Sequence, residues 1–424
     1  MAKGSAMATG EVGVCNCTQG PCAHDDKSAL QNIQELDTLA LQAGDPLPME
    51  NKRKHEERTM NENTVTILAH GDVLPDRPSP EYLFELVLPT LKQADILFGQ
   101  LEAPLSDKGE PQLHMAPVRK VPADRVSALA AAGYDILSLA GNHHLDRGEA
   151  AFFETLDVLA KNKIATVGAG KNIEEARKPV IFERKGIKIG FLAYCSVLPK
   201  GYDAKPDKSG CAPLRATTFY EQIDWQPGTP PRIVTQADKN DMAAMVEDIK
   251  KLRPQVDILF VSLHWGVHYV PGVIAMYQKE AGYAALDAGA DLILGHHAHI
   301  LKGIEVYKGK VIFYSMCNLV MPNVPGRKGS LGHSHYNIKD DPEYPDYTFP
   351  VDSRKTMIAK ILVSGKKIER VSFLPVWINK HAQPEVLPRS DKRSDEVLSY
   401  MEWCCQSQGL NAKLTRDGDE IVVT

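Results

Sequence analysis

The chain has 424 residues, of which 43% are hydrophobic and 24% are charged, a composition typical of a globular protein. Its 49 Lys and Arg residues against 54 Asp and Glu residues give a formal net charge of −5, and this argues against a nucleic-acid-binding protein, because phosphate binding requires a basic excess or a basic stripe. No apolar run approaches the roughly 20 residues of a membrane span. The first residues also lack the basic, apolar and small-residue regions that follow one another in a signal peptide. We therefore expect a soluble, cytoplasmic protein without a membrane anchor.

The chain is expected to divide into one large domain and two appended segments. Residues 1–63 show little apolar periodicity and predict a mostly disordered N-terminal extension. Cys15, Cys17 and Cys22 lie in it with a spacing that fits no zinc template well, so we do not interpret them as a metal site. Residues 64–380 form the predicted main domain, and residues 381–424 predict a small C-terminal helix and hairpin.

Strand and helix patterns alternate through the main domain. Strands are predicted over 64–71, 94–104, 134–142, 164–168, 256–266 and 290–299, with helices between most of them. Two segments, 180–196 and 303–318, each contain two strands around a tight turn and predict hairpins. Long loops are expected over 198–232 and from 319 to about 352, followed by closing strands over 356–375. This order predicts an α/β core with some antiparallel pairing.

Half of the histidines follow strand patterns directly. Seven of the 14 histidines fall in the clusters GNHH (141–144), HWGVH (264–268) and GHHAH (295–299), and two further strands end at Asp72 and Glu102. The carboxyl ends of strands in an open α/β sheet meet at one crevice, so these side chains are expected to converge. Asp, Glu, Asn and His together suit Mn, Fe, Co or Zn and contain too much nitrogen for a calcium or magnesium cage. The sequence therefore predicts a site for a divalent transition metal.

Five ordered motifs resemble those of a known family. They are HGD (70–72), LEAPL (101–105), LAGNHHLDRG (139–148), SLHWG (262–266) and GHHAHILKGIEVYKGKVIFYS (295–315). Over about Thr64 to Ile378 the chain resembles the CapA/PgsA family of capsule and poly-gamma-glutamate biosynthesis proteins, within the calcineurin-like metallophosphoesterase superfamily. The resemblance implies an α/β (α+β) fold, a four-layer sandwich of two mixed β-sheets flanked by helices.

The resemblance also implies roles for individual residues. His143 matches the family's catalytic or transition-state-stabilising histidine, Asp146 would orient it, and Arg119 matches an arginine that faces the substrate. His296 stands where the family tolerates other residues, so we interpret it as structural. The implied ligands of one or two metal ions are Asp72, Glu102, Asn142, His264, His297 and His299.

The chain departs from the family pattern at several positions. The superfamily usually opens with an Asp-x-His pair, whereas this chain has His70-Gly71-Asp72, and residues two apart on a strand point to the same face. We hypothesise that His70 supplies the missing ligand nitrogen. Gln100 replaces a usual Asn, His268 replaces a usual Glu, and Met316-Cys317-Asn318 replaces the common Leu-Gly-Asn.

Two predicted loops, 198–232 and 322–350, are rich in aromatic residues. If they cover the site, they favour a small, partly apolar substrate; the alternative is that they are plain surface loops. We take His268 and His335 as further substrate-binding candidates. The other loop residues of interest are Tyr202, Trp225, His333, Tyr336, Tyr344, Tyr347 and Phe349.

The preferred functional interpretation is a soluble metal-dependent hydrolase that uses a metal-activated water on a small-molecule ester, amide or phosphoester. Two alternatives stay open: a non-catalytic accessory protein of poly-gamma-glutamate or capsule biosynthesis, and a metal-dependent lyase on the same scaffold. The sequence also leaves open whether the chain forms a homo-oligomer.

Overall fold

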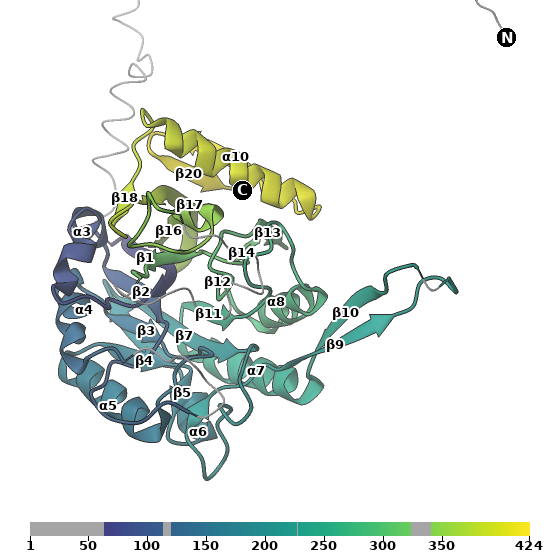
Figure 1. Ribbon diagram of the computed structural model, residues 1–424, viewed down its shortest axis with the longest axis horizontal. Coiled ribbons are helices and arrows are strands. Elements are labelled where there is room, and N and C mark those ends of the chain that lie inside the picture. Colours follow the sequence, from purple (N-terminus) through teal and green to yellow (C-terminus); the bar gives the residue numbers. More distant parts are fainter. Residues whose placement is uncertain (1–62, 113–119, 227, 324–340) are drawn as a thin grey trace, which may run out of the picture. The chain divides into compact units, whose positions relative to one another are not determined.

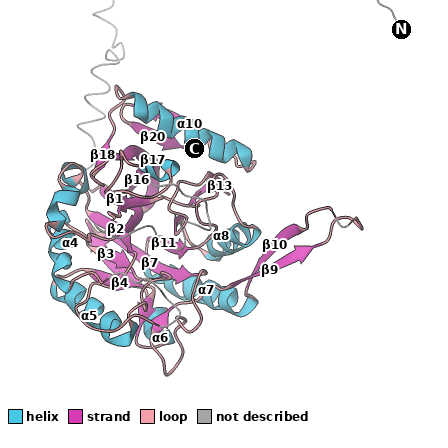
Figure 2. Ribbon diagram, viewed as in Figure 1, coloured by secondary structure: helices cyan, strands magenta, loops and turns pink. Residues whose placement is uncertain are grey.

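Two mixed β-sheets packed face to face form the centre of the fold (Figures 1 and 2). The computed structural model describes residues 63–112, 120–226, 228–323 and 341–424. Within these residues one sheet has ten strands and the other has six. Phe98 of the larger sheet stacks on Phe191 of the smaller, with ring centroids 5.6 Å apart. The main hydrophobic core therefore lies between the two sheets.

The larger sheet joins a parallel part to an antiparallel part. Its order is β19-β20-β17-β16-β1-β2-β3-β4, with β15 beside β1 and β18 beside β17. Strands β1 to β4 run parallel, whereas β16 pairs antiparallel with both β1 and β17. The bounds are β1 (Val65–Val73), β2 (Ile96–Leu101), β3 (Ile136–Ser138), β4 (Ala165–Val167), β15 (Asn318–Val320), β16 (Lys355–Ser364), β17 (Lys367–Ile378), β18 (Pro384–Val386), β19 (Leu414–Asp417) and β20 (Glu420–Val423).

The smaller sheet has four parallel strands and an antiparallel strand at each edge. Its order is β13-β14-β12-β11-β7-β6. Strands β11 and β12 are buried along their whole length, as expected for central parallel strands. The bounds are β6 (Val180–Arg184), β7 (Ile187–Cys195), β11 (Ile258–His264), β12 (Leu292–His296), β13 (Ile304–Tyr307) and β14 (Lys310–Phe313).

Helices cover the outer faces of the sheets. Helix α5 contacts β4 of the larger sheet, whereas α7 contacts β7 and α8 contacts β12 of the smaller sheet. Helix α7 begins after Asp238, whose carboxylate accepts hydrogen bonds from the backbone N–H groups of Asn240 and Asp241, as a good N-cap does. The α-helices are α3 (Leu88–Leu91), α4 (Val126–Ala132), α5 (Gly148–Lys161), α6 (Ile173–Ala176), α7 (Lys239–Leu252), α8 (Met276–Ala288) and α10 (Lys392–Ser407). The short 3-10 helices are η2 (Pro80–Phe84), η3 (Ala123–Arg125), η4 (Arg253–Gln255) and η5 (Val351–Arg354).

This arrangement confirms the predicted fold class, with two mixed sheets flanked by helices. Both predicted hairpins are present, as β6–β7 and β13–β14. The prediction of a plain loop over 198–232 is wrong, because this segment contains β8 (Gly210–Cys211), β9 (Ala216–Glu221) and the start of β10 (Arg232–Ala237). Strand β8 pairs with β5 (Ala169–Gly170), and β9 pairs with β10.

Beyond residue 380 the chain adds to the main sheet. Strand β20 pairs with β17, and α10 contacts both β17 and β13. Val397, Met401 and Ile421 belong to the same core cluster as β1 and β2. The predicted helix and hairpin over 381–424 therefore share the core of the main domain. The contacts group Asn61–Thr424 into one unit.

Several predicted features lie outside the described residues. They include Arg119, His335 and, apart from Asn63, the whole predicted extension over 1–63. Among the helices of the described ranges, none is long and apolar enough to cross a bilayer.

Candidate metal centre

Strand ends from both sheets bring acidic and histidine side chains together. Asp72 lies near the end of β1, Glu102 follows β2, and His264 is the last residue of β11. All three are buried, and each offers one ligand atom within 4.8 Å of those of the other two. The two sheets thus place a carboxylate pair from one side against an imidazole from the other.

His299 joins the two carboxylates of the larger sheet. Its Nδ1 lies 3.2 Å from Oδ2 of Asp72, and its Nε2 lies 3.3 Å from Oε1 of Glu102. Burial and the nearby charge of Asp72 raise the pKa of Glu102. Burial also opposes ionisation of Asp72, but His299, together with His264 and His296, more than offsets it and the pKa of Asp72 is lowered. Asp72, Glu102 and His299 therefore form one group of donor atoms.

A second group forms around His264. Its Nε2 lies 2.7 Å from Oδ1 of Asn142 and 3.2 Å from Nδ1 of His297. Burial lowers the pKa of His264 to about 3 and that of His297 well below its ordinary value. Both imidazoles are therefore neutral at physiological pH, which is the form that binds metals. The six residues that the family resemblance implies as ligands thus form two adjacent groups of three.

These donors fit a divalent cation because the protein leaves several of them unsatisfied. Both carboxylate oxygens of Asp72, Oε2 of Glu102 and Nδ1 of His264 are buried without a hydrogen-bond partner. Buried polar atoms are nearly always paired, and an unpaired carboxylate is costly. A cation between these side chains would satisfy them at once, and the mixture of oxygen and imidazole nitrogen suits Mn, Fe, Co or Zn.

The backbone at the centre is held in strained conformations. His297 and His299 have φ angles of 88° and 53°, in the left-handed region that residues other than glycine rarely adopt. Gly71 lets β15 approach β1, because a Cβ at this position would lie 1.9 Å from the carbonyl oxygen of Cys317. Strain of this kind concentrates at functional sites, where the surrounding structure holds it in place.

His143 and Asp146 form a hydrogen-bonded pair beside the donors. Nδ1 of His143 lies 2.6 Å from Oδ2 of Asp146, and its Nε2 lies 3.8 Å from Oε1 of Glu102. Burial lowers the pKa of His143, but the hydrogen bond and the charge of Asp146 outweigh it and the pKa is raised. The side chain is 32% exposed. His143 can therefore hold a proton at the open side of the centre.

The structure does not bring His70 into either group. Its Nδ1 lies 2.9 Å from the carbonyl oxygen of Gly71, and its Nε2 lies 2.7 Å from the hydroxyl of Tyr134. Both ring nitrogens are therefore engaged in the protein. The register between β1 and β2 also shifts between Ala69 and Asp72, so the two-residue alternation fails here. The ligand role hypothesised for His70 would require one of these hydrogen bonds to break, and it stays a prediction.

Three residues at the centre were missed or given another role by the sequence analysis. Oδ1 of Asn318 lies 2.7 Å from Nδ1 of His299, and Asn318 stands beside Asp72 in the sheet. Tyr202 donates a hydrogen bond to Oδ1 of Asp146. His296, interpreted as structural, is completely buried with Nδ1 3.7 Å from Oδ1 of Asp72. The sequence signals were Asn318 at the altered Leu-Gly-Asn position and Tyr202 in the aromatic loop over 198–232.

Aromatic rings cover one side of the centre. His268, a predicted substrate-binding residue, stacks on His297 with ring centroids 3.8 Å apart. Tyr269 and Phe349 lie 5.6 and 5.2 Å from the ring of His299. We call His268, Tyr269 and Phe349 the aromatic wall. Of the other predicted substrate-binding residues, Arg119 and His335 lie outside the described ranges.

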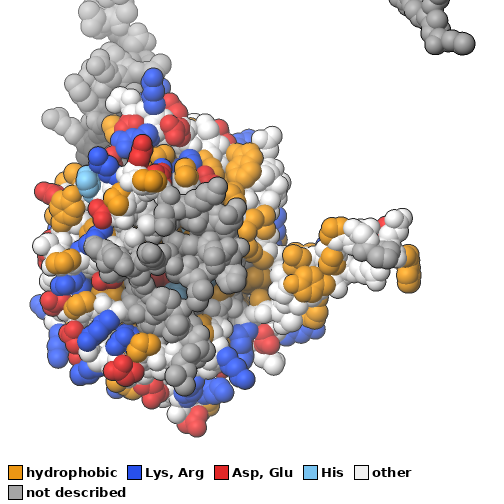
Figure 3. All heavy atoms as spheres, in the orientation of Figure 1, with side chains coloured by type: hydrophobic (Ala, Val, Ile, Leu, Met, Phe, Trp, Pro, Cys, Tyr) orange, Lys and Arg blue, Asp and Glu red, His pale blue; other side chains and the backbone are white. Residues whose placement is uncertain are grey.

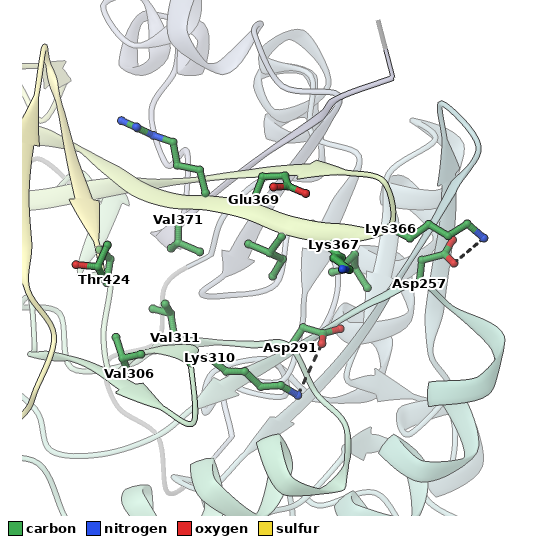
Figure 4. Close-up of a pocket in the computed structure, with 15 residues that line it drawn as sticks. Asp257, Asp291, Val306, Lys310, Val311, Lys366, Lys367, Glu369, Val371 and Thr424 are labelled. Atoms are coloured by element: carbon green, nitrogen blue, oxygen red, sulfur yellow. Dashed lines mark ion pairs between the residues drawn. The ribbon is translucent and has the colours of Figure 1, made fainter. Parts of the chain in front are cut away.

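A separate cavity of about 380 Å³ lies at the opposite ends of the strands (Figure 4). Asp257 and Asp291, which precede β11 and β12, face it. Asp257 pairs with Lys366 at 3.0 Å, and Asp291 lies 3.7 Å from Lys310. Because these carboxylates are paired with lysines, this cavity offers no donor set like that of the metal centre.

Substitution of Glu102 by Gln is expected to change stability in opposite directions with and without metal. The raised pKa of Glu102 means that the folded state binds this proton more tightly than the unfolded state. In metal-free protein the protonated form therefore stabilises the fold at low pH, and this stability is lost as pH rises above 4.5, the ordinary value. The neutral amide of the Glu102→Gln variant avoids this loss of stability, but it removes a carboxylate oxygen that would bind the metal. We expect Glu102→Gln to raise the Tm of metal-free protein at neutral pH and to weaken Mn²⁺ binding at least about tenfold.

Thermal unfolding with chelator and with Mn²⁺ across pH, together with calorimetric Mn²⁺ titration, checks this expectation. Glu110→Gln, at an exposed position, is the matched control and should change neither quantity. A Glu102→Gln variant that binds Mn²⁺ as tightly as the wild type would contradict the assignment of Glu102.

Comparisons with solved structures found neighbours among phosphoesterases and nucleotidases. One is a putative 5'-nucleotidase from Staphylococcus aureus, 12% identical, covering 80% of this chain and 58% of that one, with a TM-score of 0.40. Another is the calcineurin-like phosphoesterase YfkN from Bacillus subtilis, 13% identical, covering 81% and 97%, with a TM-score of 0.37.

Sequence comparisons found relatives named for capsule and polymer synthesis. The PGA biosynthesis protein CapA of Bacillus subtilis is 26% identical over 318 residues, covering 72% of this chain and 76% of that protein. A probable polyglutamine synthesis accessory protein of Mycobacterium tuberculosis is 30% identical over 288 residues, covering 66% and 68%. The family model described as bacterial capsule synthesis protein PGA_cap matches residues 66–323. The resemblance inferred from the five motifs is thereby confirmed, and the chain belongs to the PGA_cap family of bacterial capsule synthesis proteins.

Proposed function

We propose that this protein is a metal-dependent hydrolase that acts on a small-molecule ester, amide or phosphoester. The observation that carries the proposal is the convergence of Asp72, Glu102 and His264 with buried, unpaired ligand atoms. Side chains buried in this state destabilise a fold unless a ligand satisfies them. The presence of these unsatisfied side chains at one place supports a function that requires a bound cation.

Each of two adjacent cations would be held by residues that come from both sheets. Asp72, Glu102 and His299 would hold one ion, and Asn142, His264 and His297 would hold a second next to it. His264 stands between the two, because its ligand atom lies within 4.8 Å of those of Asp72 and Glu102. Divalent ions bound in this way lower the pKa of water toward about 7 and polarise an electrophilic oxygen. The pKa of Glu102 is raised in the metal-free protein, so its proton would leave when a cation binds.

His143 is the residue best placed to handle a proton during the reaction. Asp146 holds Nδ1 of the imidazole, and Nε2 points to the side of the centre where Glu102 lies. A protonated His143 can donate from Nε2 to a leaving group or to developing negative charge, and solvent can return the proton afterwards. Tyr202 donates to the second oxygen of Asp146 and so fixes the orientation of that carboxylate.

The aromatic wall supports a small and partly apolar substrate. His268 and Tyr269 come from the segment after β11, and Phe349 comes from the segment before η5, so two distant parts of the chain supply it. Stacked rings offer apolar contact area and favour planar or apolar groups over a long anionic polymer. Substrate contact here would also exclude water from the donors.

The names of the relatives favour a second candidate function. A relative described as a synthesis accessory protein suggests that this chain could bind a polymer or an enzyme of polymer synthesis without turnover. In that case the centre would bind a cation and hydrolyse none of the three substrate classes.

The proposal is tested by metal analysis of the purified protein together with a hydrolase screen over phosphoester, ester and amide substrates. We expect bound transition metal and turnover of one class. His143→Asn should lower kcat by about 10²–10⁴-fold, the usual contribution of a proton-transferring group, with the metal content unchanged. His297→Ala, the matched control from the donor groups, should lose metal and activity together. Stoichiometric metal without turnover in any class would reject the hydrolase and leave the accessory function.

Phe349→Ala tests the aromatic wall once a substrate is known. Loss of this apolar contact should raise KM about tenfold with little change in kcat, because the ring contacts His299 from the side and is not part of the donor set. Steady-state kinetics measures both values. Tyr82→Ala removes an aromatic ring that is 47% exposed and should leave KM unchanged. Unchanged kinetics of Phe349→Ala would mean that substrate does not reach the wall.

A further inference from the structure

A two-stranded arm projects from the fold (Figures 1 and 3). Among the strands of the described residues, β9 and β10 pair only with each other, in antiparallel register from Ala216↔Ala237 to Glu221↔Arg232. The second half of β10 rests on α8, where Thr235 Oγ1 accepts a hydrogen bond from the backbone N–H of Tyr277. In β9, by contrast, every residue after Ala216 is exposed.

The arm exposes large apolar side chains. Trp225, near its tip, is 96% exposed, and the other members are Phe219, Tyr220, Ile223 and Ile233, at 49–72%. A two-stranded hairpin is at best marginally stable alone in water. Several large apolar side chains gathered on one exposed element usually mark an interaction surface. These exposed side chains mark the arm as a candidate interaction surface.

The free edge of β9 indicates the kind of partner. Its sequence, ATTFYE, contains neither lysine nor proline, the residues that commonly protect edge strands from pairing. Threonine and aromatic residues also favour β structure. An edge of this kind is a template for another strand, and an identical β9 running antiparallel satisfies the requirement of two-fold symmetry.

Charge favours one register for two copies of β9. If the two-fold axis passes beside Thr218, Glu221 of each copy stands opposite Arg215 of the other. Opposite charges across strands are stabilising, and this contact would extend the exposed ion pair that Glu221 already forms with Arg232 at 2.5 Å within its own arm. Arg215 already binds Asp241 at 2.6 Å, yet its Nη1 lies 3.9 Å from Asp203 and its side chain is 52% exposed. The guanidinium of Arg215 can therefore pair with a further carboxylate.

The same register brings each tip to the base of the other arm. A cavity of about 300 Å³ lies there, lined in part by Tyr194, Ala204, Pro213, Arg215 and Ala244. Its lining is partly apolar and it opens beside the first residue of β9. The exposed Ile223 and Trp225 of the second copy are the side chains that would reach it.

We propose that this arm joins two copies of the chain, by antiparallel pairing of β9 with β9 of the second copy and by seating of each tip at the base of the other arm. The inference is independent of the proposed hydrolase function, since it uses no residue of the metal centre.

Sedimentation of the full-length protein tests the association. We expect the wild type to sediment as a dimer at micromolar concentration and the double variant Ile223→Ser/Trp225→Ser to sediment as a monomer with unchanged Tm. Trp403→Ser removes a tryptophan that is 47% exposed on α10 and should remain dimeric. A monomeric wild type, or a double variant that stays dimeric, overturns the proposal.

Cysteine cross-linking tests the register of β9 with β9 of the second copy, and it does not depend on Ile223 and Trp225 at the tip of the arm. Opposite residues of antiparallel strands have Cα atoms about 4.5–5.5 Å apart, a spacing that a disulfide bridges. In full-length protein with Cys15, Cys17 and Cys22 replaced by Ser, mild oxidation should convert Thr218→Cys into a covalent dimer. The remaining cysteines are buried. Gln236→Cys, exposed on β10, should stay uncross-linked. Failure of Thr218→Cys to cross-link, or equal cross-linking of both variants, overturns the proposed pairing.

Discussion

The burial of ligand atoms that lack a hydrogen-bond partner is the constraint on which the rest of the structure depends. Two carboxylates and several imidazoles lie together out of water. Both oxygens of Asp72 and one of Glu102 have no hydrogen-bond partner, although His299 lies 3.2 Å from Asp72. Removal of such groups from solvent costs several kcal/mol for an isolated charge. The fold must offset this cost with stabilising free energy from other contacts. The two surrounding sheets provide it by burying a continuous hydrophobic core.

The two-sheet architecture explains how these atoms meet. Parallel strands β1 and β2 deliver Asp72 and Glu102 from one sheet, and β11 and β12 deliver the histidines from the other. Neither sheet alone carries a complete donor group, since His299 reaches across to the carboxylates. The left-handed backbone at His297 and His299 is the local strain that this crossing requires.

Much of the fold and of the candidate site could be predicted, because the sequence patterns that indicate them lie within single strands and the residues that follow directly. Buried-strand patterns that end in Asp, Glu or His indicate side chains at the carboxyl edge of a sheet, and this holds for Asp72, Glu102 and His264. For His70 the local pattern is less informative, because the register with β2 shifts before Asp72 and the imidazole hydrogen-bonds to Gly71 and Tyr134. Asn318 and Tyr202 reach the centre through pairing and packing between distant segments, which no local pattern encodes. The sequence analysis did not predict the β9–β10 arm, because the proline and glycine residues around it indicated a loop. The segments ATTFYE and RIVTQA nevertheless have strand character.

The cation-binding account is tested most directly by anomalous diffraction from crystals of the protein grown with Mn²⁺. The account predicts Mn²⁺ peaks within coordination distance of Asp72, Glu102 and His299, and of Asn142, His264 and His297. Crystals without a peak between these side chains would contradict it.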